Sequence, residues 1–473
     1  MAFIAVVMLD RALQDARLSS ALLVLLGLAT RLAFIWYPNE VVFDEVHFGS
    51  LLSAYYTHQY YFDIHPPLGK LLMAGWGKLF GCHASLRFDH IGQVFGDSSY
   101  IVLRALPNIA GGLIPVVLYR LLGALSISRP AALLAASFIL FDNAFLAQSH
   151  FVLIDSFYLL FGFSGLWWFF RAKQKGYRIL DLTPACAALA LSVSVKWVGL
   201  GFLGLAAVVM MANQARVLTL GRPRAPLKAC ASISALLGIP AVVYAVIFWI
   251  HLAVLPRAGA GDPFMSTRFQ NISQGSSRSS ESEFQAVSLV TKVWEMNRSM
   301  LAANQTLKAG HPYESKFYTW PFMSRPVSYW KRDFIDGKTG YIYCLGNPAV
   351  WWLSTFGVMG GLFTLIKNWS SLGWTGLARD WLYVGYALSF LPFALISRAM
   401  FLYHYLPALA YSGAILAALL FDEWDPTNRR QRTLWISLLV MTLLGFLFFS
   451  PLSYGWPLDS TGYQSRMWFR SWI

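Results

Sequence analysis

The sequence predicts an all-α polytopic membrane protein. Of its 473 residues, 57% are hydrophobic and only 13% are charged, and the mean hydropathy is +0.51. A typical soluble domain carries roughly 25% charged residues. The apolar runs are long and do not alternate with polar residues, which favours membrane-spanning helices over strands. This composition excludes a water-soluble globular enzyme and a disordered chain.

The long apolar runs give the predicted spans in chain order. A transmembrane helix needs about 20 mainly apolar residues, and about eleven stretches meet this requirement. They are 18–38, 98–120, 130–148, 150–170, 180–195, 197–213, 229–254, 347–366, 380–397, 399–421 and 433–451. The whole chain, 1–473, is therefore expected to form one transmembrane domain.

The basic residues predict the topology. With the N-terminus inside, the connections near 120–129, 171–178, 216–228, 367–379 and 429–432 are cytoplasmic, and all are rich in Lys or Arg. Two long segments, 39–97 and 255–346, then lie outside. The net charge of +14 follows mainly from this asymmetry. Because no basic and aromatic binding module is present, we expect no nucleic-acid partner.

The first outer segment contains an amphipathic stretch. Leu71, Leu72, Trp76 and Phe80 recur at helical spacing within Leu68–Phe80. Such a helix lies in the membrane interface rather than crossing the bilayer. The Pro-Pro pair directly before it fixes a turn and begins the helix.

Two adjacent acids, Asp44 and Glu45, lie in the apolar stretch Val41–Phe48, just past the outer end of the first span. A solvated loop acid is the simple interpretation. However, an apolar setting at a membrane surface would desolvate a carboxylate and adapt it to act as a base. Adjacent side chains on an extended chain point in opposite directions. We therefore expect one base and one structural or orienting group.

Several other polar residues lie where a bilayer makes them costly. Cations near the outer membrane face suit a phosphate headgroup, although an intramembrane Arg can also snorkel or pair with an acid. His65 could equally anchor its turn, and a histidine in a span is often a helix contact. The candidates are Arg31, Arg104 and Lys196 as cations, and His65, Asp155, Trp197, His311, Arg325 and His404 as further polar or aromatic groups.

No metal or cofactor is expected from the sequence. It contains no HxH, HExxH or DxD pattern, and its cysteines Cys82, Cys186, Cys230 and Cys344 have no CxxC spacing. Cys82 and Cys344 both fall outside in the predicted topology, so a disulfide between them is permitted.

Seven blocks in a fixed order carry a family resemblance. They are Val42–Gly49, Phe62–Lys70, Phe141–Asn143 with Leu153–Asp155, Ser194–Gly199, His311–Pro326, Gly346–Trp352 and Leu402–Pro407. Together they resemble the protein O-mannosyltransferases, glycosyltransferase family 39 of the GT-C superfamily. The resemblance covers most of the chain and implies a GT-C fold with two large extracytoplasmic loops that contain interfacial helices.

The resemblance also implies an activity. Family members transfer mannose from a polyprenyl phosphate to Ser or Thr hydroxyls of translocated proteins, on the extracytoplasmic face of the membrane. The family's catalytic base corresponds to Asp44, with Glu45 beside it. Its span arginines correspond to Arg31 and Arg104, which with Lys196 would bind the donor phosphate. The remaining candidates named above would bind substrate.

The implied partners are polyprenyl-phosphate-mannose, secreted or membrane proteins, membrane lipids and the secretion translocon. The second loop, of about 90 residues, is too short to hold the β-trefoil MIR domain of eukaryotic members as well as its own segments. The size is typical of a bacterial enzyme in the cytoplasmic membrane. Ser50 and His150 stand where many relatives have basic residues.

Two other functions fit parts of the sequence. A GT-C enzyme with a lipid acceptor, like the aminoarabinose transferases, shares the acidic first loop and the polyprenyl donor. The Lys196-Trp197 pair and the loop 311–326 favour a protein acceptor instead. A transporter or flippase could use Asp155 and Arg104 along a pathway, but the two large outer loops argue against it.

Overall fold

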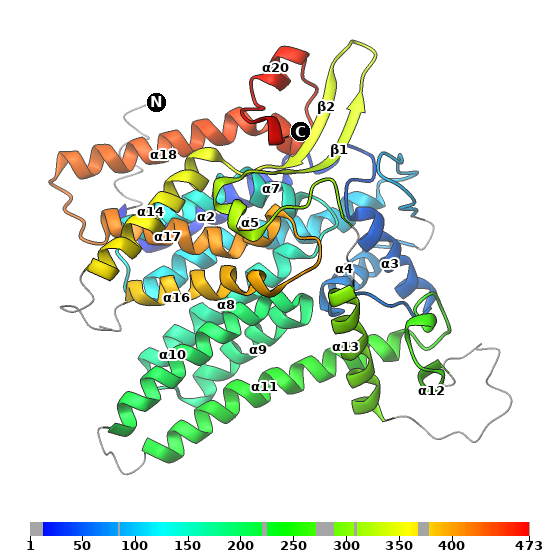
Figure 1. The fold of residues 1–473 in the computed structure, drawn as a ribbon, viewed down its shortest axis with the longest axis horizontal. Helices are drawn as coiled ribbons and strands as arrows, with labels where there is room; N and C mark the ends of the chain where they lie inside the picture. The colour runs from blue at the N-terminus through cyan, green and yellow to red at the C-terminus, as the bar shows by residue number, and fades with distance from the viewer. Residues whose placement is uncertain are drawn as a thin grey trace.

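The computed structural model describes residues 13–83, 86–219, 225–270, 288–306, 310–367 and 378–472. Over these ranges the chain is mostly helical, and its only sheet is a two-stranded hairpin. The predicted fold class is confirmed. Figure 1 shows the long helices packed side by side along the longest axis of the molecule.

Every predicted span contains a helix. The main helices are α2 (Ala16–Leu32), α5 (Ser99–Ala124), α6 (Arg129–Leu140), α7 (Asn143–His150), α8 (Asp155–Gln174), α9 (Ile179–Val195), α10 (Leu200–Thr219), α11 (Ala225–Val254), α14 (Pro348–Lys367), α16 (Ala378–Phe390), α17 (Leu406–Phe421) and α18 (Arg429–Phe449). Five helices in the described ranges are long and apolar enough to cross a membrane, or six if α6 and α7 form one bent span. The chain is an integral membrane protein, and the count of about eleven spans stays a prediction.

The two predicted outer segments fold at one end of the bundle. They form α3 (Glu45–Thr57), α4 (Leu68–Leu79), η2 (Asp262–Phe264), α12 (Thr267–Gln270), α13 (Leu289–Thr306), η3 (Phe317–Phe322), β1 (Val327–Asp333) and β2 (Thr339–Cys344). All the labelled ones lie to the right in Figure 1, while the end of α10, the start of α11 and the α17–α18 connection lie to the left. This arrangement agrees with the predicted sides of the membrane. Residues 220–224 and 368–377 of the predicted inner loops lie outside the described ranges.

Short elements complete the chain. The strands β1 and β2 are antiparallel, pairing from Val327↔Cys344 to Asp333↔Thr339 with an irregularity after Ser328. The amphipathic stretch forms α4, which begins directly after Pro67, as predicted. The remaining elements are η1 (Trp197–Gly199), η4 (Leu391–Leu395), η5 (Leu402–Tyr405), α19 (Pro451–Tyr454), α20 (Ser460–Gln464) and η6 (Arg470–Trp472).

A buried carboxylate breaks the predicted span 130–148. Asp142 lies between α6 and α7, which meet at 55°. Its Oδ1 accepts a bond from the Phe145 amide at 2.9 Å, and its Oδ2 accepts from the Asn347 amide at 2.9 Å and the Trp351 indole at 2.8 Å. The carboxylate therefore caps α7 and ties it to the start of α14.

A close backbone approach joins α2 to α5. A Cβ atom on Gly27 would lie 2.1 Å from the carbonyl oxygen of Gly112, so neither helix can carry a side chain there. Small residues of this kind let membrane helices pack closely. The first span is thereby held against the helix that carries Arg104.

The disulfide that the predicted topology permits between Cys82 and Cys344 is not formed in the structure. Cys82 and Cys344 are both buried free thiols in the structure. The Cys82 thiol faces the carbonyl oxygen of Ser99 at 3.7 Å, whereas Cys344 ends β2 and pairs in register with Val327. The two residues belong to separate parts of the outer layer, which the sequence could not show.

Candidate active site

Asp44 lies at the N-terminal end of α3, in the outer layer of the bundle. Its carboxylate is partly exposed and makes no hydrogen bond within the described part of the chain. The residue before it, Phe43, has a left-handed φ of 49°, and its ring stacks on Tyr329 with 3.9 Å between centroids. The Phe43 amide also donates to the Tyr329 carbonyl at 3.0 Å. These contacts stabilise an unfavourable backbone conformation that sets the direction of Asp44.

The environment makes Asp44 more basic. Burial raises the pKa of its carboxyl to about 6; the charges of His47 and Lys196 lower it, and those of Asp155 and Asp63 raise it. A carboxylate with this pKa is ionised at pH 7 and accepts a proton more readily than an ordinary aspartate. Asp44 thus meets the requirements of a general base.

Glu45 has a different role, because it is completely buried. Its Oε1 accepts bonds from Arg104 Nε at 2.8 Å and from the Val152 amide at 2.9 Å. Its Oε2 accepts bonds from Arg104 at 2.7 Å and from the Val42 amide at 2.9 Å. Both oxygens are therefore occupied. Glu45 therefore fits the structural or orienting group that the sequence predicts beside the base, rather than a catalytic one, because its side chain fixes the loop that presents Asp44.

Arg104 and Arg31, which the sequence suggests as phosphate ligands, are bound to the protein itself in the structure. Besides Glu45, the guanidinium of Arg104 donates to the carbonyls of Pro38 at 2.7 Å and Glu40 at 2.8 Å. Arg31 is equally buried and donates to the carbonyl of Leu140 at 2.5 Å. Both arginines are enclosed and engaged with the protein itself. Neither is accessible to a phosphate in this structure.

A second ionic cluster lies next to Asp44. Asp63 pairs with Lys70 and with His47, whose Nε2 lies 3.2 Å from Asp63 Oδ1. Burial raises the pKa of Asp63, but the charge of Lys70 and the His47 hydrogen bond hold it well below its usual value. Burial lowers the pKa of His47, yet the bond to Asp63 raises it overall. His47 is half exposed, and its positive charge faces Asp44.

Lys196 interrupts the helical run between α9 and α10. Its backbone is extended, which ends α9 and lets the side chain reach Asp155 with 2.9 Å between Nζ and Oδ1. The same Nζ lies 5.1 Å from the ring centroid of Tyr403, and that ring in turn contacts Phe43 at 6.1 Å. The prediction that Lys196 and Asp155 lie near the site is consistent with these contacts.

A cavity of about 430 Å³ opens beside this cluster. Three basic side chains line it: His65, Lys196 and Arg398. Most of the remaining lining is apolar and comes from α10, α16, η4 and α13. Burial and nearby Lys196 lower the pKa of His65 well below its usual value, so its ring is neutral at pH 7. A cavity with basic groups and apolar walls is suited to a lipid phosphate.

Arg398 was not selected as a site residue from the sequence. It is half-buried between η4 and η5, and no hydrogen bond or ion pair of its guanidinium is seen in the described ranges. The feature of the sequence that could have pointed to Arg398 is that it is an isolated cation in a short predicted outer loop. Its side chain, unlike those of Arg31 and Arg104, is open to an anion.

Trp197 lines the cavity and also positions the helix that covers it. Its indole donates to the Tyr244 hydroxyl at 3.1 Å, which donates to Asn297 of α13 at 2.6 Å. Near the other end of α13, the Asn304 amide bonds the Ile64 carbonyl at 3.2 Å. The first two bonds hold α13 to α11 and η1, and the Asn304 bond docks the second outer segment onto the first.

Three further predicted residues do not line this cavity. His311 is exposed and packs edge-on against Phe401, with 5.0 Å between ring centroids. Arg325 donates to the Pro312 carbonyl at 2.9 Å. His404 is buried, and its ring lies 4.7 Å from that of Tyr403. The helix-contact interpretation fits His404.

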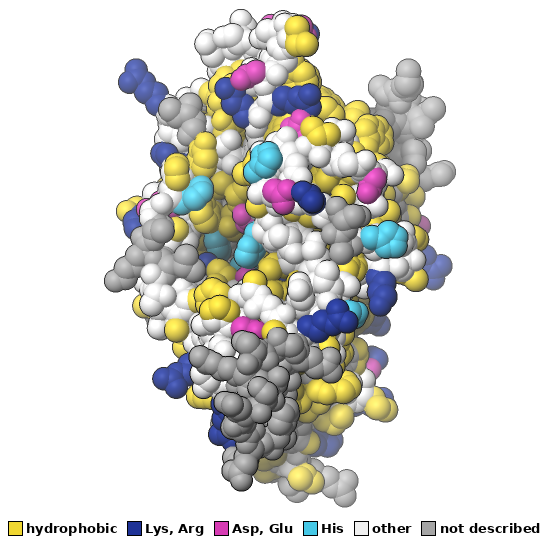
Figure 2. Space-filling model, turned by 90° about the vertical axis from the view of Figure 1, so that its right-hand side faces the viewer, with side chains coloured by type: hydrophobic (Ala, Val, Ile, Leu, Met, Phe, Trp, Pro, Cys, Tyr) yellow, Lys and Arg dark blue, Asp and Glu magenta, His cyan; other side chains and the backbone are white. Residues whose placement is uncertain are grey.

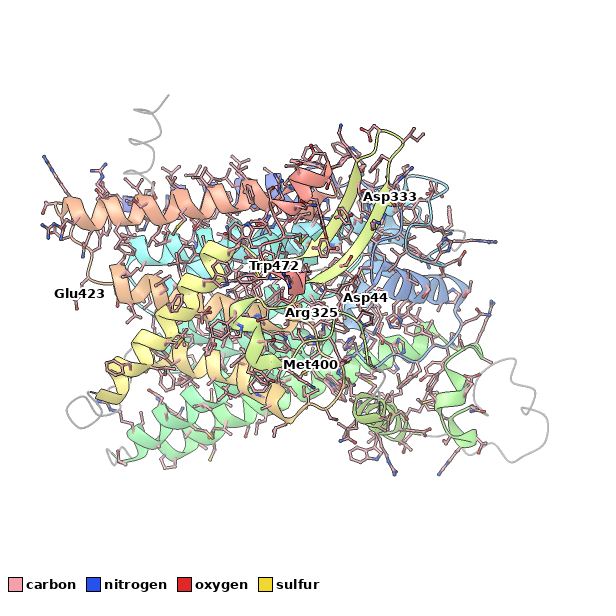
Figure 3. The ribbon with its side chains drawn as sticks, turned by 45° about the horizontal axis from the view of Figure 1, so that its top comes forward. Asp44, Arg325, Asp333, Met400, Glu423 and Trp472 are labelled. Carbon is pink, nitrogen blue, oxygen red and sulfur yellow. The ribbon has the colours of Figure 1, made fainter. Side chains whose placement is uncertain are left out.

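The site faces the end of the molecule that carries the outer segments. Figure 2 views this end and shows histidine and acidic side chains around a recess near its centre. Figure 3 places Asp44 in this half and Glu423 at the opposite end. Among the described residues no group of three or more His, Cys, Asp or Glu side chains could hold a metal ion.

Two family models match the chain. Residues 21–255 match the model described as dolichyl-phosphate-mannose-protein mannosyltransferase, and residues 289–472 match the C-terminal four-transmembrane region of protein O-mannosyltransferase. The chain belongs to the protein O-mannosyltransferase family. The predicted family is therefore confirmed.

Curated relatives match about half of this mannosyltransferase-family chain. The Candida albicans dolichyl-phosphate-mannose–protein mannosyltransferase 4 is 32% identical over 53% of this chain and 35% of its own length. The Drosophila melanogaster protein O-mannosyltransferase 1 is 34% identical over 52% of this chain and 29% of its own length. The chain thus spans about a third of the length of these relatives.

Solved structures share the fold. The Saccharomyces cerevisiae Pmt1-Pmt2 complex bound to the sugar donor superposes with a TM-score of 0.88 at 20% identity, covering 97% of this chain and 92% of that one. The Archaeoglobus fulgidus oligosaccharyltransferase in its apo form gives 0.56 at 13% identity, covering 96% and 57%. The GT-C fold expected from the resemblance is confirmed.

The contrast between Glu45 and Asp44 predicts opposite effects on stability. Glu45→Gln removes the charge that compensates buried Arg104, which costs about 3–5 kcal/mol. Asp44→Asn is the matched control, because the neighbouring carboxylate has no partner to lose; since burial already disfavours its charge, the neutral amide should not lower the stability. Thermal unfolding of both purified variants in one detergent measures the difference. Equal midpoints would show that Glu45 is not the structural member of the pair.

Proposed function

We propose that this chain transfers mannose from polyprenyl-phosphate-mannose to Ser or Thr hydroxyls of proteins. The observation that carries the proposal is one unpartnered carboxylate, Asp44, beside a cavity with basic side chains and apolar walls. Family membership supports the same reaction. A sugar joined to a lipid phosphate already has a good leaving group, so the reaction requires a base and cations but no general acid.

The cavity would hold the donor. Its apolar walls on α10 and α16 suit the first isoprene units of the lipid. Lys196 and Arg398 would contact the phosphate and stabilise the charge that develops on it as the glycosidic bond breaks. Neutral His65 lies at the same cavity and would donate or accept a single hydrogen bond.

Asp44 would activate the acceptor. The acceptor oxygen forms a bond to the anomeric carbon while the bond from that carbon to the phosphate oxygen breaks. The bonding electron pair leaves with the phosphate, and the hydroxyl proton passes to Asp44. A single displacement of this kind inverts the configuration of the anomeric carbon. The partly exposed carboxylate is open to a polypeptide from the outer side.

The predicted topology places this site on the extracytoplasmic face. Acceptor proteins would reach it as they leave the secretion translocon. We propose the bacterial cytoplasmic membrane as the location, since the length of the second outer segment is typical of bacterial members. Donor, acceptor protein and surrounding lipids are then the required partners, with no further cofactor.

Asp44→Asn should abolish transfer and leave donor binding intact. The amide keeps the size of the side chain but cannot take the acceptor proton, so the rate should fall at least about a hundredfold. Purified protein is incubated with radiolabelled polyprenyl-phosphate-mannose and a Ser/Thr-rich peptide, and label in the peptide is counted. Asp336→Asn, an exposed acid at the hairpin tip, is the control and should keep full activity. Label in lipid would indicate the lipid-acceptor reaction, and undiminished transfer by Asp44→Asn would exclude this base.

Arg398→Gln should weaken donor binding. Loss of one charge-assisted contact to the phosphate costs about 1.5–3 kcal/mol, or roughly a tenfold to hundredfold rise in the donor KM. Steady-state transfer at varied donor and saturating peptide measures this change. Lys331→Gln removes an exposed cation from β1 on the same face and should leave the donor KM unchanged. A donor KM in Arg398→Gln equal to that of the control would remove Arg398 from the phosphate site.

A further inference from the structure

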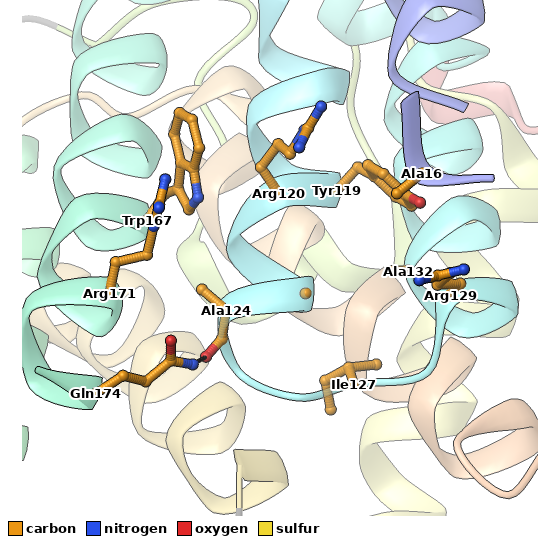
Figure 4. Close-up of a pocket in the computed structure, with 11 residues that line it drawn as sticks. Ala16, Tyr119, Arg120, Ala124, Ile127, Arg129, Ala132, Trp167, Arg171 and Gln174 are labelled. Atoms are coloured by element: carbon orange, nitrogen blue, oxygen red, sulfur yellow. Dashed lines mark hydrogen bonds between the residues drawn. The ribbon is translucent and has the colours of Figure 1, made fainter. Parts of the chain in front are cut away.

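A second cavity lies at the opposite end of the bundle, away from Asp44. It has a volume of about 350 Å³ and lies between α2, α5, α6 and α8. The connections that join these helices at this end are the ones predicted to be cytoplasmic. Figure 4 shows side chains from neighbouring helices bordering the same space. None of the proposed catalytic or donor-binding residues lines it.

Three arginines border this inner cavity: Arg120 from α5, Arg129 from the start of α6 and Arg171 from α8. Arg129 donates to the carbonyl of Gln14, and Arg171 lies 5.9 Å from the ring centroid of Trp167. No hydrogen bond or ion pair of the Arg120 side chain is seen in the described part of the chain. The lining contains no Asp or Glu. The lining of the inner cavity is therefore positively charged, and Asp181, which lies outside the lining, acts electrostatically on Arg171.

A buried hydroxyl in the same cavity lacks a partner. Tyr119 is only 4% exposed, lines the inner cavity, and its hydroxyl makes no hydrogen bond in the structure. A buried polar group normally has a partner, because leaving it unpaired costs about 1–3 kcal/mol. An anionic oxygen in the cavity would accept a bond from this hydroxyl. The preference for basic residues on cytoplasmic loops explains the arginines but not this buried donor.

An apolar groove continues from the inner cavity along the membrane-spanning surface. The groove lies between α2 and α5, and its lining includes Leu25, Leu28 and Val116. Arg120 lines both the groove and the inner cavity. Leu25 is 64% exposed in the protein alone, so in the bilayer this apolar surface is covered by an apolar component of the membrane. A charged recess that opens into an apolar groove has the shape and polarity of a phospholipid.

We propose that this inner site binds an anionic phospholipid. The headgroup phosphate would lie among Arg120, Arg129 and Arg171 and accept the Tyr119 hydroxyl, and one acyl chain would occupy the α2–α5 groove. Basic recesses between membrane helices on the cytoplasmic side select anionic headgroups in this way. Because α2 and α5 also lead to the outer site, the lipid would brace the two helices that carry Arg31 and Arg104.

Native mass spectrometry tests the site directly. Delipidated protein is mixed with equal amounts of phosphatidylglycerol and phosphatidylcholine that have identical acyl chains. We expect one phosphatidylglycerol to be retained at least about tenfold more strongly than phosphatidylcholine. Arg120→Gln/Arg171→Gln should lose this preference, and Tyr119→Phe should weaken phosphatidylglycerol retention.

A matched control separates the site from general surface charge. Arg429→Gln/Arg430→Gln removes the same charge from exposed residues at the start of α18 and should keep the preference. If the Gln pair does not fold, Arg120→Lys/Arg171→Lys takes its place. It keeps the charge and should retain phosphatidylglycerol over phosphatidylcholine. Equal retention of both lipids by the native protein, equal losses in the two Gln pairs, or preferential retention of added polyprenyl phosphate would overturn the proposal.

Discussion

The buried ion pair between Glu45 and Arg104 is the constraint on which the outer site depends. It joins the loop after the first span to α5, and Glu45 also binds the amide of Val152 before α8. Separating two such charges in an apolar interior is costly, so the loop has one stable position. Since Asp44 directly precedes Glu45 and follows the strained Phe43, that position also fixes the direction of Asp44, the proposed base.

The need to compensate a buried charge also distinguishes the charges that stabilise the fold from those that are available to substrates. In a low-dielectric environment a charge is stable only when it is compensated, and most buried charges here are: Asp63 with Lys70, and Glu45 with Arg104. Asp44 and Arg398 differ because their side chains form no such pair within the described ranges. They lie where a substrate hydroxyl and a phosphate would provide the missing interactions. The paired charges thus stabilise the structure around the site, and the unpaired side chains of Asp44 and Arg398 are the ones available to substrates.

The sequence predicted the helical fold, the two outer segments, the α4 helix and the importance of Asp44, because each follows from local composition or spacing. It did not predict the protein partners that Arg31 and Arg104 have in the structure. Burial among backbone carbonyls and the pairing of Glu45 with a residue 59 positions away are tertiary facts that no local pattern encodes. Arg398 was not selected from the sequence because its surroundings also depend on tertiary contacts. Its neighbours His65 and Lys196 come from distant parts of the chain and meet only around the cavity.

The pH dependence of single-turnover mannose transfer tests the central claim, that a desolvated Asp44 is the base. The base must be ionised, so the rate should be low in acid, rise through pH about 6 and level off above it. Because the positive charge of His47 lowers the pKa of Asp44, His47→Gln should move the midpoint to higher pH. A rate that stays constant from pH 5 to pH 8 in the native protein would contradict the account.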